Sequence, residues 1–455
     1  MKCAHPNKAQ EVFSKVLLKI KPTPKENEKS LKAAYVLIEK LKKVAPSFVR
    51  IELAGSLAKG TNLKGRNEFD IFILFPRHYS HHEIALLGLS YARRAFAGMH
   101  LESRYAEHPY IQIQTPYYKA DVVPAYNIES IEQKGSSVDR SILHTRYVNA
   151  HLSLQQKDEV RLLKRFMKNF GIYGAELRVE GFSGYLCELL LIKYGSLLSL
   201  MEAASTWSQP TIVFEGSISE EEARKRFSSP LVVVDPVDPR RNVAAVVSQT
   251  SLSRFIFECR RFLKAPSERF FFLKKPRKSP SGIVKHIQER GTECLAVIFP
   301  APKTIPDVLW PQLKKTAHAI VRKLQEQDFG VFGFYYWSDG KECDILLELD
   351  RWKLPKIKKL QGPSVQFASD VDSFIIKHSK ALNIHLEHDK IVAVEKRKET
   401  EARRFLLKSI SNTAGMGIPV LMEKQLRLAK VLPASLIANR KRLEFLSDYF
   451  FAKIA

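Results

Sequence analysis

The first 150 residues combine two hydrophobic patterns, one with a helical period and one that alternates. Residues 8–20 and 25–44 carry apolar positions at helical spacing with lysines on the outer face, which predicts two amphipathic helices. Four shorter runs have the alternation that is typical of strands: 48–53, 68–75, 110–114 and 118–123. We therefore expect a mixed β-sheet flanked by helices in this part of the chain.

Helical periodicity dominates the next stretch of the chain. Residues 155–170 predict an amphipathic helix with one apolar face and one basic face. The basic face carries four side chains: Arg161, Lys164, Arg165 and Lys168. Residues 181–204 are apolar almost throughout and predict a second long helix, buried at the centre of a helical domain.

Beyond about residue 270, helical and strand patterns are mixed again. The expected helices are 282–290 and 311–327, and the expected strands are 295–299, 331–336 and 344–348. Residues 400–455 read as helical and basic. The whole pattern is typical of a multidomain α+β protein, and 455 residues at about 150 per domain suggest roughly three domains.

Net charge distinguishes this chain from an average globular protein. Its apolar share of 45% and its charged share of 27% are ordinary. However, the chain contains 73 lysines and arginines but only 48 aspartates and glutamates, which gives a net charge of +25. Such an excess indicates a polyanionic partner, most simply nucleic acid, with an acidic membrane surface as the alternative.

Three other classes of protein are disfavoured by the sequence. The most apolar stretch, 185–200, is interrupted by Glu188 and Lys193, so it falls short of the roughly 20 apolar residues that a spanning helix needs. The N-terminal residues contain no apolar core of a signal peptide. The five cysteines are scattered and form no Cys-x-x-Cys pair, which argues against a zinc ribbon or a disulfide framework. We expect a cytosolic protein that does not associate with membranes.

A Gly-Ser turn follows the strand expected at 48–53. Gly55 allows backbone N–H groups to approach an anion closely, and Ser56 and Lys59 can hydrogen-bond and neutralise phosphate oxygens. The loop is not a P-loop, because no Gly-Lys-Ser/Thr sequence closes it. It leads instead into a strand that carries carboxylates.

Three carboxylates lie on the strands that follow this loop. Glu68 and Asp70 are two residues apart, so their side chains share one face of the strand. Side-by-side carboxylates repel each other unless a cation lies between them, and oxygen-only ligands favour Mg²⁺ or Mn²⁺. Asp121 lies in the apolar strand 120–124, where burial is costly unless the carboxylate is paired or binds metal, so it is the natural third ligand.

The Glu-x-Asp pattern alone does not establish a metal site, because the solvated face of an edge strand carries the same pattern. The combination with the Gly-Ser loop and with Asp121 favours metal-dependent chemistry. Three carboxylates beside a phosphate-binding loop indicate phosphoryl or nucleotidyl transfer with two metal ions about 3.5–4 Å apart.

Four further segments extend the sequence signal well beyond the carboxylates. They are RLLKRF (161–166), GIYGAE (171–176), GFSGYL (181–186) and DPVDPRRNVA (235–244). With these segments in this order, the chain resembles the archaeal, class I CCA-adding enzymes, which are tRNA nucleotidyltransferases of the polymerase-β superfamily. The resemblance is strong over residues 45–250 and looser from there to the end.

This resemblance implies a role for each candidate site residue. The implied ligands of two Mg²⁺ ions, with Mn²⁺ as an alternative, are the catalytic carboxylates Glu68, Asp70 and Asp121. The implied nucleotide-binding residues are Gly55, Ser56, Lys59, His144, Lys164, Tyr173 and Arg241. Of these, Arg241 corresponds to the family's base-reading arginine. Relatives often carry arginine at the position of Lys59, and lysine keeps the charge but loses the bidentate fork.

Each of the four downstream residues also has a purely structural interpretation. His144 reads equally as a core histidine, and Lys164 as part of a solvated basic helix face. Tyr173 follows Gly171 and reads as a packing aromatic, while Arg241 reads as surface charge after a rigid turn. Only the family context favours the functional reading of all four.

The resemblance also implies an activity and a domain plan. The activity is template-independent addition of C, C and A to the 3′ end of tRNA from CTP and ATP, with release of pyrophosphate. The implied plan is a polymerase-β-like catalytic head (1–149), a helical central nucleotide-binding domain (150–268), a C-terminal RNA-binding domain (269–317 and 400–455) and a tail domain contacting tRNA (318–399). We expect contacts with the acceptor stem and the TΨC arm of tRNA, and a homodimer is compatible with the family.

Two alternatives remain open at the level of sequence. One is another polymerase-β-like RNA nucleotidyltransferase, such as a poly(A) polymerase or an oligoadenylate synthetase. The segments from 161 to 244 argue against it. The other is a non-catalytic RNA-binding relative, which the presence of all three carboxylates disfavours.

Overall fold

The computed structural model divides into two compact units, residues 1–274 and 275–455. It describes residues 1–65, 67–105, 109–133, 135–136, 138–208, 211–213, 219–273, 278–439 and 441–451. The first unit contains a five-stranded sheet and a helical core, and the second contains a four-stranded and a three-stranded sheet.

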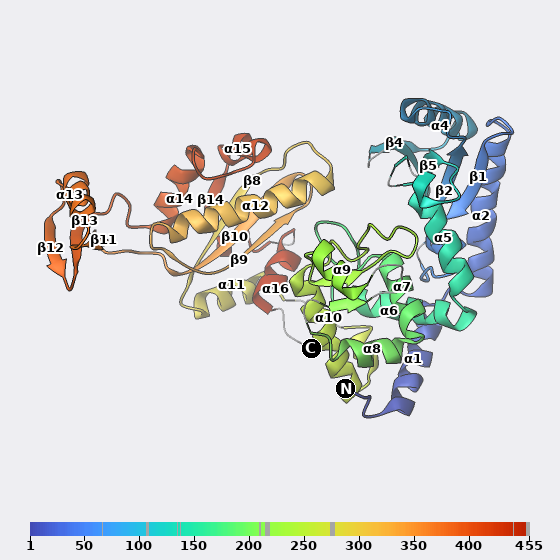
Figure 1. The fold of residues 1–455 in the computed structure, drawn as a ribbon, viewed down its shortest axis with the longest axis horizontal. Helices are drawn as coiled ribbons and strands as arrows, with labels where there is room; N and C mark the ends of the chain where they lie inside the picture. The colour runs from blue at the N-terminus through green and yellow to red at the C-terminus, as the bar shows by residue number, and fades with distance from the viewer. Residues whose placement is uncertain are drawn as a thin grey trace. The chain divides into compact units, whose positions relative to one another are not determined.

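The sheet of the first unit is mixed, as the sequence predicts (Figure 1). Its strands, in spatial order, are β1 (Arg50–Ala54), β2 (Glu68–Phe75), β5 (Lys119–Tyr126), β4 (Pro109–Gln114) and β3 (Leu101–Tyr105). The central pair β2 and β5 is parallel, and the other neighbours are antiparallel. The predicted strand at 68–75 is therefore confirmed, whereas β3 was not anticipated.

Helices α2 (Pro24–Lys42) and α4 (His81–Ala95) pack with this sheet around one hydrophobic core. On β2, Phe69, Ile71 and Ile73 are at most 2% exposed and enter this core. Because successive side chains alternate across a strand, Glu68 and Asp70 lie on the opposite face. The predicted division of the strand into an apolar face and an acidic face is confirmed.

A helical layer follows the sheet in the chain. Its helices are α5 (Arg140–His151), α6 (Leu154–Asn169), α7 (Gly184–Tyr194), α8 (Leu197–Ala204) and α10 (Gln249–Lys264). The N-terminal helix α1 (Pro6–Ile20) packs into the same core, where its Phe13 stacks on Phe262. Short elements β6 (Thr211–Val213), α9 (Glu220–Arg226) and β7 (Leu231–Val233) lie between α8 and α10 in sequence.

The prediction of a single long helix at 181–204 is wrong, because the first helix of this stretch ends at Tyr194. Gly195 adopts a φ of +77°, a conformation that favours glycine and ends α7. Ser196 then caps α8 by accepting a hydrogen bond from the Ser199 N–H, and the two helices meet at 93°.

None of the described helices is by itself long and apolar enough to cross a membrane. The bent pair α7 and α8 reaches the required length and apolar character only when its two helices are counted together.

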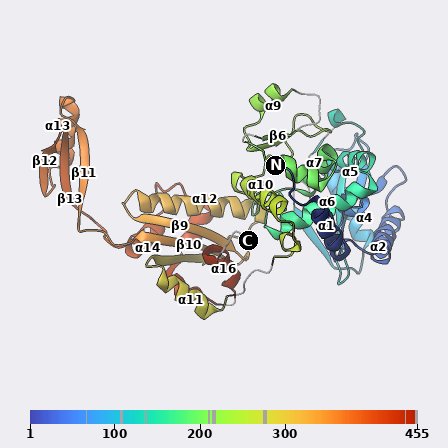
Figure 2. The same cartoon turned by 90° about the horizontal axis from the view of Figure 1, so that it is seen from below.

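The first sheet of the second unit has the order β14-β8-β10-β9 and is antiparallel throughout. Its strands are β8 (Glu293–Pro300), β9 (Gly330–Ser338), β10 (Glu342–Arg351) and β14 (Lys430–Pro433). Helix α12 (Pro306–Gln325) covers one face, and α11 (Pro280–Glu289) and α16 (Leu443–Phe451) cover the other (Figure 2). The predicted helices and strands between 282 and 348 are confirmed.

Three features of the second unit differ from the expected plan or extend it. Residues 400–455 are not all helical, because β14 lies between α15 (Val420–Leu426) and α16 and pairs with β8. A separate three-stranded sheet, β11-β13-β12, is formed by Ile357–Ser364, Lys390–Lys396 and Asn383–Glu387, together with α13 (Ala368–Lys377). The expected domain boundary at 317/318 lies inside helix α12.

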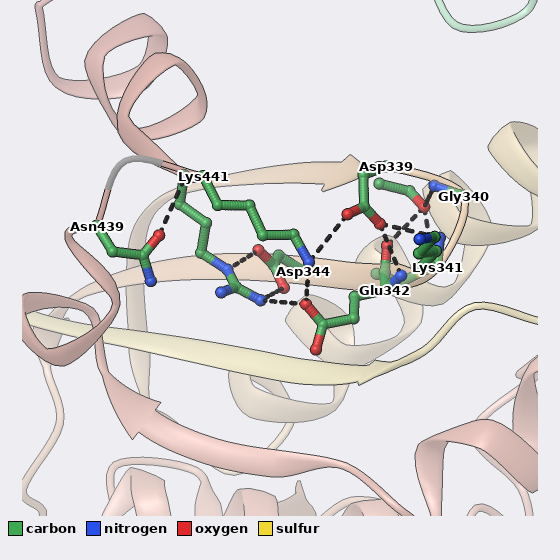
Figure 3. A network of polar contacts seen from close by, with 10 residues as sticks. Asp339, Gly340, Lys341, Glu342, Asp344, Asn439 and Lys441 are labelled. Atoms are coloured by element: carbon green, nitrogen blue, oxygen red, sulfur yellow. Dashed lines mark hydrogen bonds and ion pairs between the residues drawn. The ribbon is translucent and has the colours of Figure 1, made fainter.

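Buried carboxylates of β10 hold the C-terminal helix against the sheet, and Figure 3 shows the polar network around one of them, Asp344. Asp344 is fully buried and pairs with Arg442, which directly precedes α16. The Arg442 Nε and Nη2 atoms each donate to one oxygen of the Asp344 carboxylate. Four residues further along β10, Glu348 accepts hydrogen bonds from the Arg290 side chain and, at 2.8 Å, from the Tyr449 hydroxyl of α16. Both ends of α16 are therefore tied to one face of β10.

Candidate active site

The Gly-Ser turn lies directly against the acidic strand. Strand β1 ends at Ala54, and Gly55 begins the short helix α3 (Gly55–Ala58) with a φ of +71°. A Cβ at this position would lie 2.0 Å from the Asp70 Oδ2 atom, a distance that no side chain can accept. Two features therefore favour glycine at position 55: its left-handed backbone conformation, and a close approach that would force the Asp70 side chain to shift if a Cβ were present. Ser56 follows it in α3 and is partly exposed.

Asp70 and Asp121 lie directly opposite each other on the parallel strands β2 and β5. The Gln112 side chain on β4 donates a 2.8 Å hydrogen bond to the Asp121 Oδ1 atom. Burial raises the pKa of Asp70 to about 6, and the Asp121 and Glu68 carboxylates add to this rise against the opposing charge of Lys59. Burial also raises the pKa of Asp121, and Glu68 again contributes.

This donor set fits a divalent cation in its chemistry. Its candidate ligands are all carboxylate oxygens. Burial, and after it the charge of neighbouring carboxylates, raises the pKa of Asp70 and of Asp121, and a bound cation would offset both effects. Among the described residues, no three His, Cys, Asp or Glu side chains already converge closely enough to hold a metal ion. Of the three carboxylates, Glu68 is the most exposed.

A buried glutamate that the sequence analysis did not single out holds the lysines of the site. Glu188 on α7 is fully buried, and its Oε2 atom lies 2.6 Å from the Lys59 Nζ atom. Its Oε1 atom accepts hydrogen bonds from the Thr61 hydroxyl at 2.7 Å and from the Lys164 Nζ atom at 3.1 Å. Burial alone would raise the pKa of Glu188, but the ammonium groups of Lys59 and Lys164 outweigh it and lower the pKa to about 2. The carboxylate is therefore ionised at neutral pH.

The remaining predicted residue of this region, Tyr173, lies close to Lys164. A Cβ on Gly184 would be 3.1 Å from the Tyr173 hydroxyl and 3.6 Å from the Lys164 Nζ atom, so both groups border the first residue of α7. Lys164 is only 2% exposed, which excludes the reading of its helix face as merely solvated. Burial lowers the pKa of Lys164, and Glu188 opposes that shift.

A second buried carboxylate, Asp235, contacts two further predicted site residues, His144 and Arg241. It lies 2.9 Å from the His144 Nε2 atom and 3.0 Å from an Arg241 guanidinium nitrogen. The Tyr185 hydroxyl donates to it at 3.0 Å, as does the backbone N–H of Val237. Burial alone would raise the pKa of Asp235, but His144, the Val237 backbone N–H and Arg241 lower it to about 2.

The ring of Tyr185 connects the two carboxylate centres. It stacks on the His144 imidazole with ring centroids 3.8 Å apart, and the Lys59 Nζ atom lies 5.8 Å from its centre. Burial lowers the pKa of His144 despite the opposing pull of Asp235, so the imidazole is neutral at neutral pH. The neutral ring donates its Nε2 proton to Asp235, an assignment that follows from this geometry.

The structure thus brings the ten predicted residues into two connected groups of the first unit. One group surrounds the acidic strand and the Gly-Ser turn, and the other surrounds Glu188 and Asp235. The sequence analysis did not identify Glu188, Tyr185 or Asp235 as site residues. The sequence signals for two of them were a charge in an otherwise apolar helix and a carboxylate within the DPVDP turn.

Comparison with known proteins gives three family matches along the chain. Residues 34–147 match the nucleotidyltransferase domain, and residues 158–272 match the second domain of tRNA nucleotidyltransferase. Residues 290–428 match the C-terminal domain of the CCA-adding enzyme. The matches follow one another in chain order and together cover most of the sequence.

Curated relatives agree with these matches. The CCA-adding enzyme of Methanosarcina barkeri is 38% identical over 410 residues, which are 87% of this chain and 88% of the relative. That of Saccharolobus shibatae is 34% identical over 400 residues, 88% of this chain and 92% of the relative. Among solved structures, a mutant of the Cid1 poly(U) polymerase bound to MgATP matches with a TM-score of 0.47 and 18% identity, over 59% of this chain and 98% of that chain.

Proposed function

The chain belongs to the archaeal family of CCA-adding enzymes, and we propose on that premise that Glu68, Asp70 and Asp121 are its catalytic residues. It is a template-independent tRNA nucleotidyltransferase that adds C, C and A to the tRNA 3′ end from CTP and ATP. The observation that supports the catalytic assignment is the register of β2 and β5, which sets Asp70 opposite Asp121 beside the Gly55 turn.

The three carboxylates are the proposed holders of two divalent cations, Mg²⁺ or alternatively Mn²⁺. When bound, these ions supply Lewis-acid stabilisation of the reacting phosphoryl group and of the departing pyrophosphate. The chain's own contribution is the acidic face of β2 and β5, whose mutual repulsion favours cation binding. Gln112 orients Asp121 by donating a hydrogen bond to one of its oxygens.

Positive charge for the triphosphate comes from Lys59 and Lys164 in this proposal. Both ammonium groups are held by Glu188, and one carboxylate cannot neutralise two cations, so positive charge remains for an anionic ligand. Ser56 and the backbone of the Gly55 turn supply further hydrogen-bond donors beside Asp70. His144 and Tyr173 complete the proposed contacts with the triphosphate and the sugar.

Arg241 is the proposed reader of the incoming base. Asp235 binds one guanidinium nitrogen and fixes the side chain, which stays 34% exposed, so other N–H donors can reach a base edge. A pocket that satisfies the hydrogen-bonding groups of one base discriminates strongly, because the wrong base leaves buried polar atoms unpaired. The neutral His144 and Tyr185 pack beside Asp235 and limit its movement.

We also propose how the rest of the chain serves tRNA binding. The net charge of +25 supports salt-dependent contacts with RNA phosphates, and duplex RNA is recognised mainly through its shape and backbone. We assign the acceptor stem and the TΨC arm to residues 269–455, with the catalytic head at 1–149 and the central nucleotide-binding domain at 150–268. A cytoplasmic location and a homodimer belong to this proposal too.

The assay for this function uses tRNA that lacks its terminal CCA, Mg²⁺, and labelled CTP and ATP. We expect ordered growth by three nucleotides from the wild-type chain, and none from the Asp70→Ala variant, whose tRNA affinity stays nearly intact. A long adenosine tail would instead indicate a poly(A) polymerase, and binding without growth a non-catalytic relative. Retained addition by Asp70→Ala would contradict the catalytic assignment.

A further inference from the structure

Glu188 places a charge at a buried position of an otherwise apolar helix. Its carboxylate is 0% exposed, and its neighbours on α7 are leucines and a cysteine. An apolar side chain of similar size is often as stable or more stable at such a position, because burying an ion pair carries a large desolvation penalty. The carboxylate must therefore be explained by the groups that it holds.

The groups that it holds come from two different parts of the first unit. Lys59 and Thr61 follow the Gly-Ser turn of the sheet, whereas Lys164 lies on α6 of the helical layer. The Thr61 hydroxyl donates to Glu188 and accepts from the Lys164 Nζ atom at 3.0 Å. All three donors are at most 7% exposed, so each relies on the others for its hydrogen bonds.

We propose that Glu188 is a positioning residue for triphosphate binding, which holds the Lys59 and Lys164 ammonium groups in place before the nucleotide arrives. This inference rests on the proposed function, which assigns those two lysines to the triphosphate. The Glu188 carboxylate keeps both ammonium groups ordered and partly neutralised before the nucleotide binds. An incoming triphosphate then shares preorganised donors rather than ordering two flexible lysines itself.

A positioning role and a role in joining sheet to helices predict different binding data. The Glu188→Gln variant keeps the size and a hydrogen-bond acceptor but removes the charge. Positioning predicts that CTP binding to the full chain, measured by calorimetry with Mg²⁺ and without tRNA, weakens roughly tenfold or more. Binding of CMP, which lacks the β- and γ-phosphates, stays at the wild-type level. In CCA addition the loss falls mainly on KM for CTP and less on kcat.

A matched control is available in the same helical layer. Glu258 on α10 is also fully buried and also pairs with two cations, Arg254 and Arg261. Glu258→Gln removes an equally buried charge that does not contact either lysine. It is expected to lower thermal stability and to leave the ratio of CTP to CMP affinity unchanged.

The same experiment separates this inference from the function on which it rests. If Lys164→Met keeps wild-type CTP affinity, the assignment of the lysines to the triphosphate is wrong, and the inference falls with it. If Lys164→Met weakens CTP binding but Glu188→Gln does not, only the positioning role is overturned. An equal loss of CTP and CMP affinity in Glu188→Gln also overturns it, since that pattern indicates a structural role.

A conservative variant covers the case in which Glu188→Gln fails to fold. Glu188→Asp keeps the charge and withdraws it by one methylene, so the lysines lose their fixed position but not their counterion. Positioning predicts an intermediate loss that is again confined to CTP. An unchanged ratio of CTP to CMP affinity in Glu188→Asp would overturn the inference.

Discussion

The side chain of Asp70 occupies the space that any side chain at position 55 would need. A Cβ added to Gly55 would lie 2.0 Å from the Asp70 Oδ2 atom, and the glycine has a φ of +71°. Gly55→Ala must therefore displace either the turn or the carboxylate. We expect kcat for CCA addition to fall by roughly a hundredfold, the order of loss caused by misplacing a reacting group by about 1 Å.

Gly65 provides the control for this substitution. It has a φ of +75°, yet a Cβ there meets nothing within 4 Å. Gly65→Ala thus carries a comparable backbone strain without the clash, and its kcat should stay near the wild-type value. Similar losses in both variants, measured by single-turnover addition of CTP, would mean that strain and not the contact with Asp70 controls activity.

Arg241 is expected to control the choice of base. Arg241→Met removes the guanidinium that Asp235 fixes and leaves a side chain of similar length. We expect kcat/KM for CTP and ATP to fall at least tenfold while that for the unwanted UTP changes little, because hydrogen bonds to the base edge are lost. Competition assays with mixed nucleotides measure this directly. An unchanged ratio of CTP to UTP incorporation would show that Arg241 does not recognise the base.

Asp235 is expected to make stability depend on pH in the acidic range. Burial opposes ionisation, yet the donors around Asp235 lower its pKa to about 2, compared with 3.8 for an ordinary aspartate. A lowered folded-state pKa adds stability that is complete above about pH 4 and is lost as the pH falls toward 2. The contribution is about 2 kcal/mol, and about half of it is gone at pH 3.

Urea unfolding of the wild type and of Asp235→Asn checks this prediction, since the asparagine does not titrate. The difference between their free energies of unfolding should be largest at pH 6 and should narrow at pH 4 and pH 3. A difference that stays constant over this range would show that Asp235 is not held ionised by its neighbours.

Arg442 is expected to anchor the C-terminal helix of the second unit. Its side chain is 9% exposed and pairs with the fully buried Asp344. Removing one partner of such a pair leaves an uncompensated charge, which costs roughly 3–5 kcal/mol. In Arg442→Met, hydrogen exchange should therefore accelerate in peptides from α16, and exchange in β2 and β5 should stay unchanged.

The neighbouring Lys441 is the control for the anchor. It pairs with Asp339 and Glu342 but is 42% exposed, so solvent screens its ion pairs (Figure 3). Lys441→Met should change stability by about 1 kcal/mol or less. If α16 is equally protected from hydrogen exchange in Arg442→Met and Lys441→Met, the buried pair of Arg442 and Asp344 does not hold the helix.

The sequence was sufficient for the parts of the fold that local patterns determine. The alternation of Phe69, Asp70 and Ile71 fixes which face of β2 is acidic, and the structure confirms it. The break between Tyr194 and Ser196 was missed, because an apolar helical pattern continues across it and only Gly195 signals the turn. Strand β14 was missed since four residues are too few to carry a period.

The contacts that organise the site could not be read from the sequence. Glu188 lies 129 residues from Lys59, and Asp235 lies 91 residues from His144. Pairings of this kind depend on how the sheet and the helices pack, which no local pattern encodes. Lys164 illustrates the consequence, because its basic helix stripe suggests exposure whereas the fold buries it beside Glu188.

The most direct test of the central claim is an anomalous-scattering map from crystals grown with Mn²⁺ and a non-hydrolysable CTP analogue. The account predicts Mn²⁺ peaks within about 2.1 Å of carboxylate oxygens of both Asp70 and Asp121, with Glu68 turned toward the same ions. It also predicts that these peaks vanish in Asp70→Asn. Peaks bound only to the nucleotide phosphates, with the three carboxylates left free of metal, would contradict it.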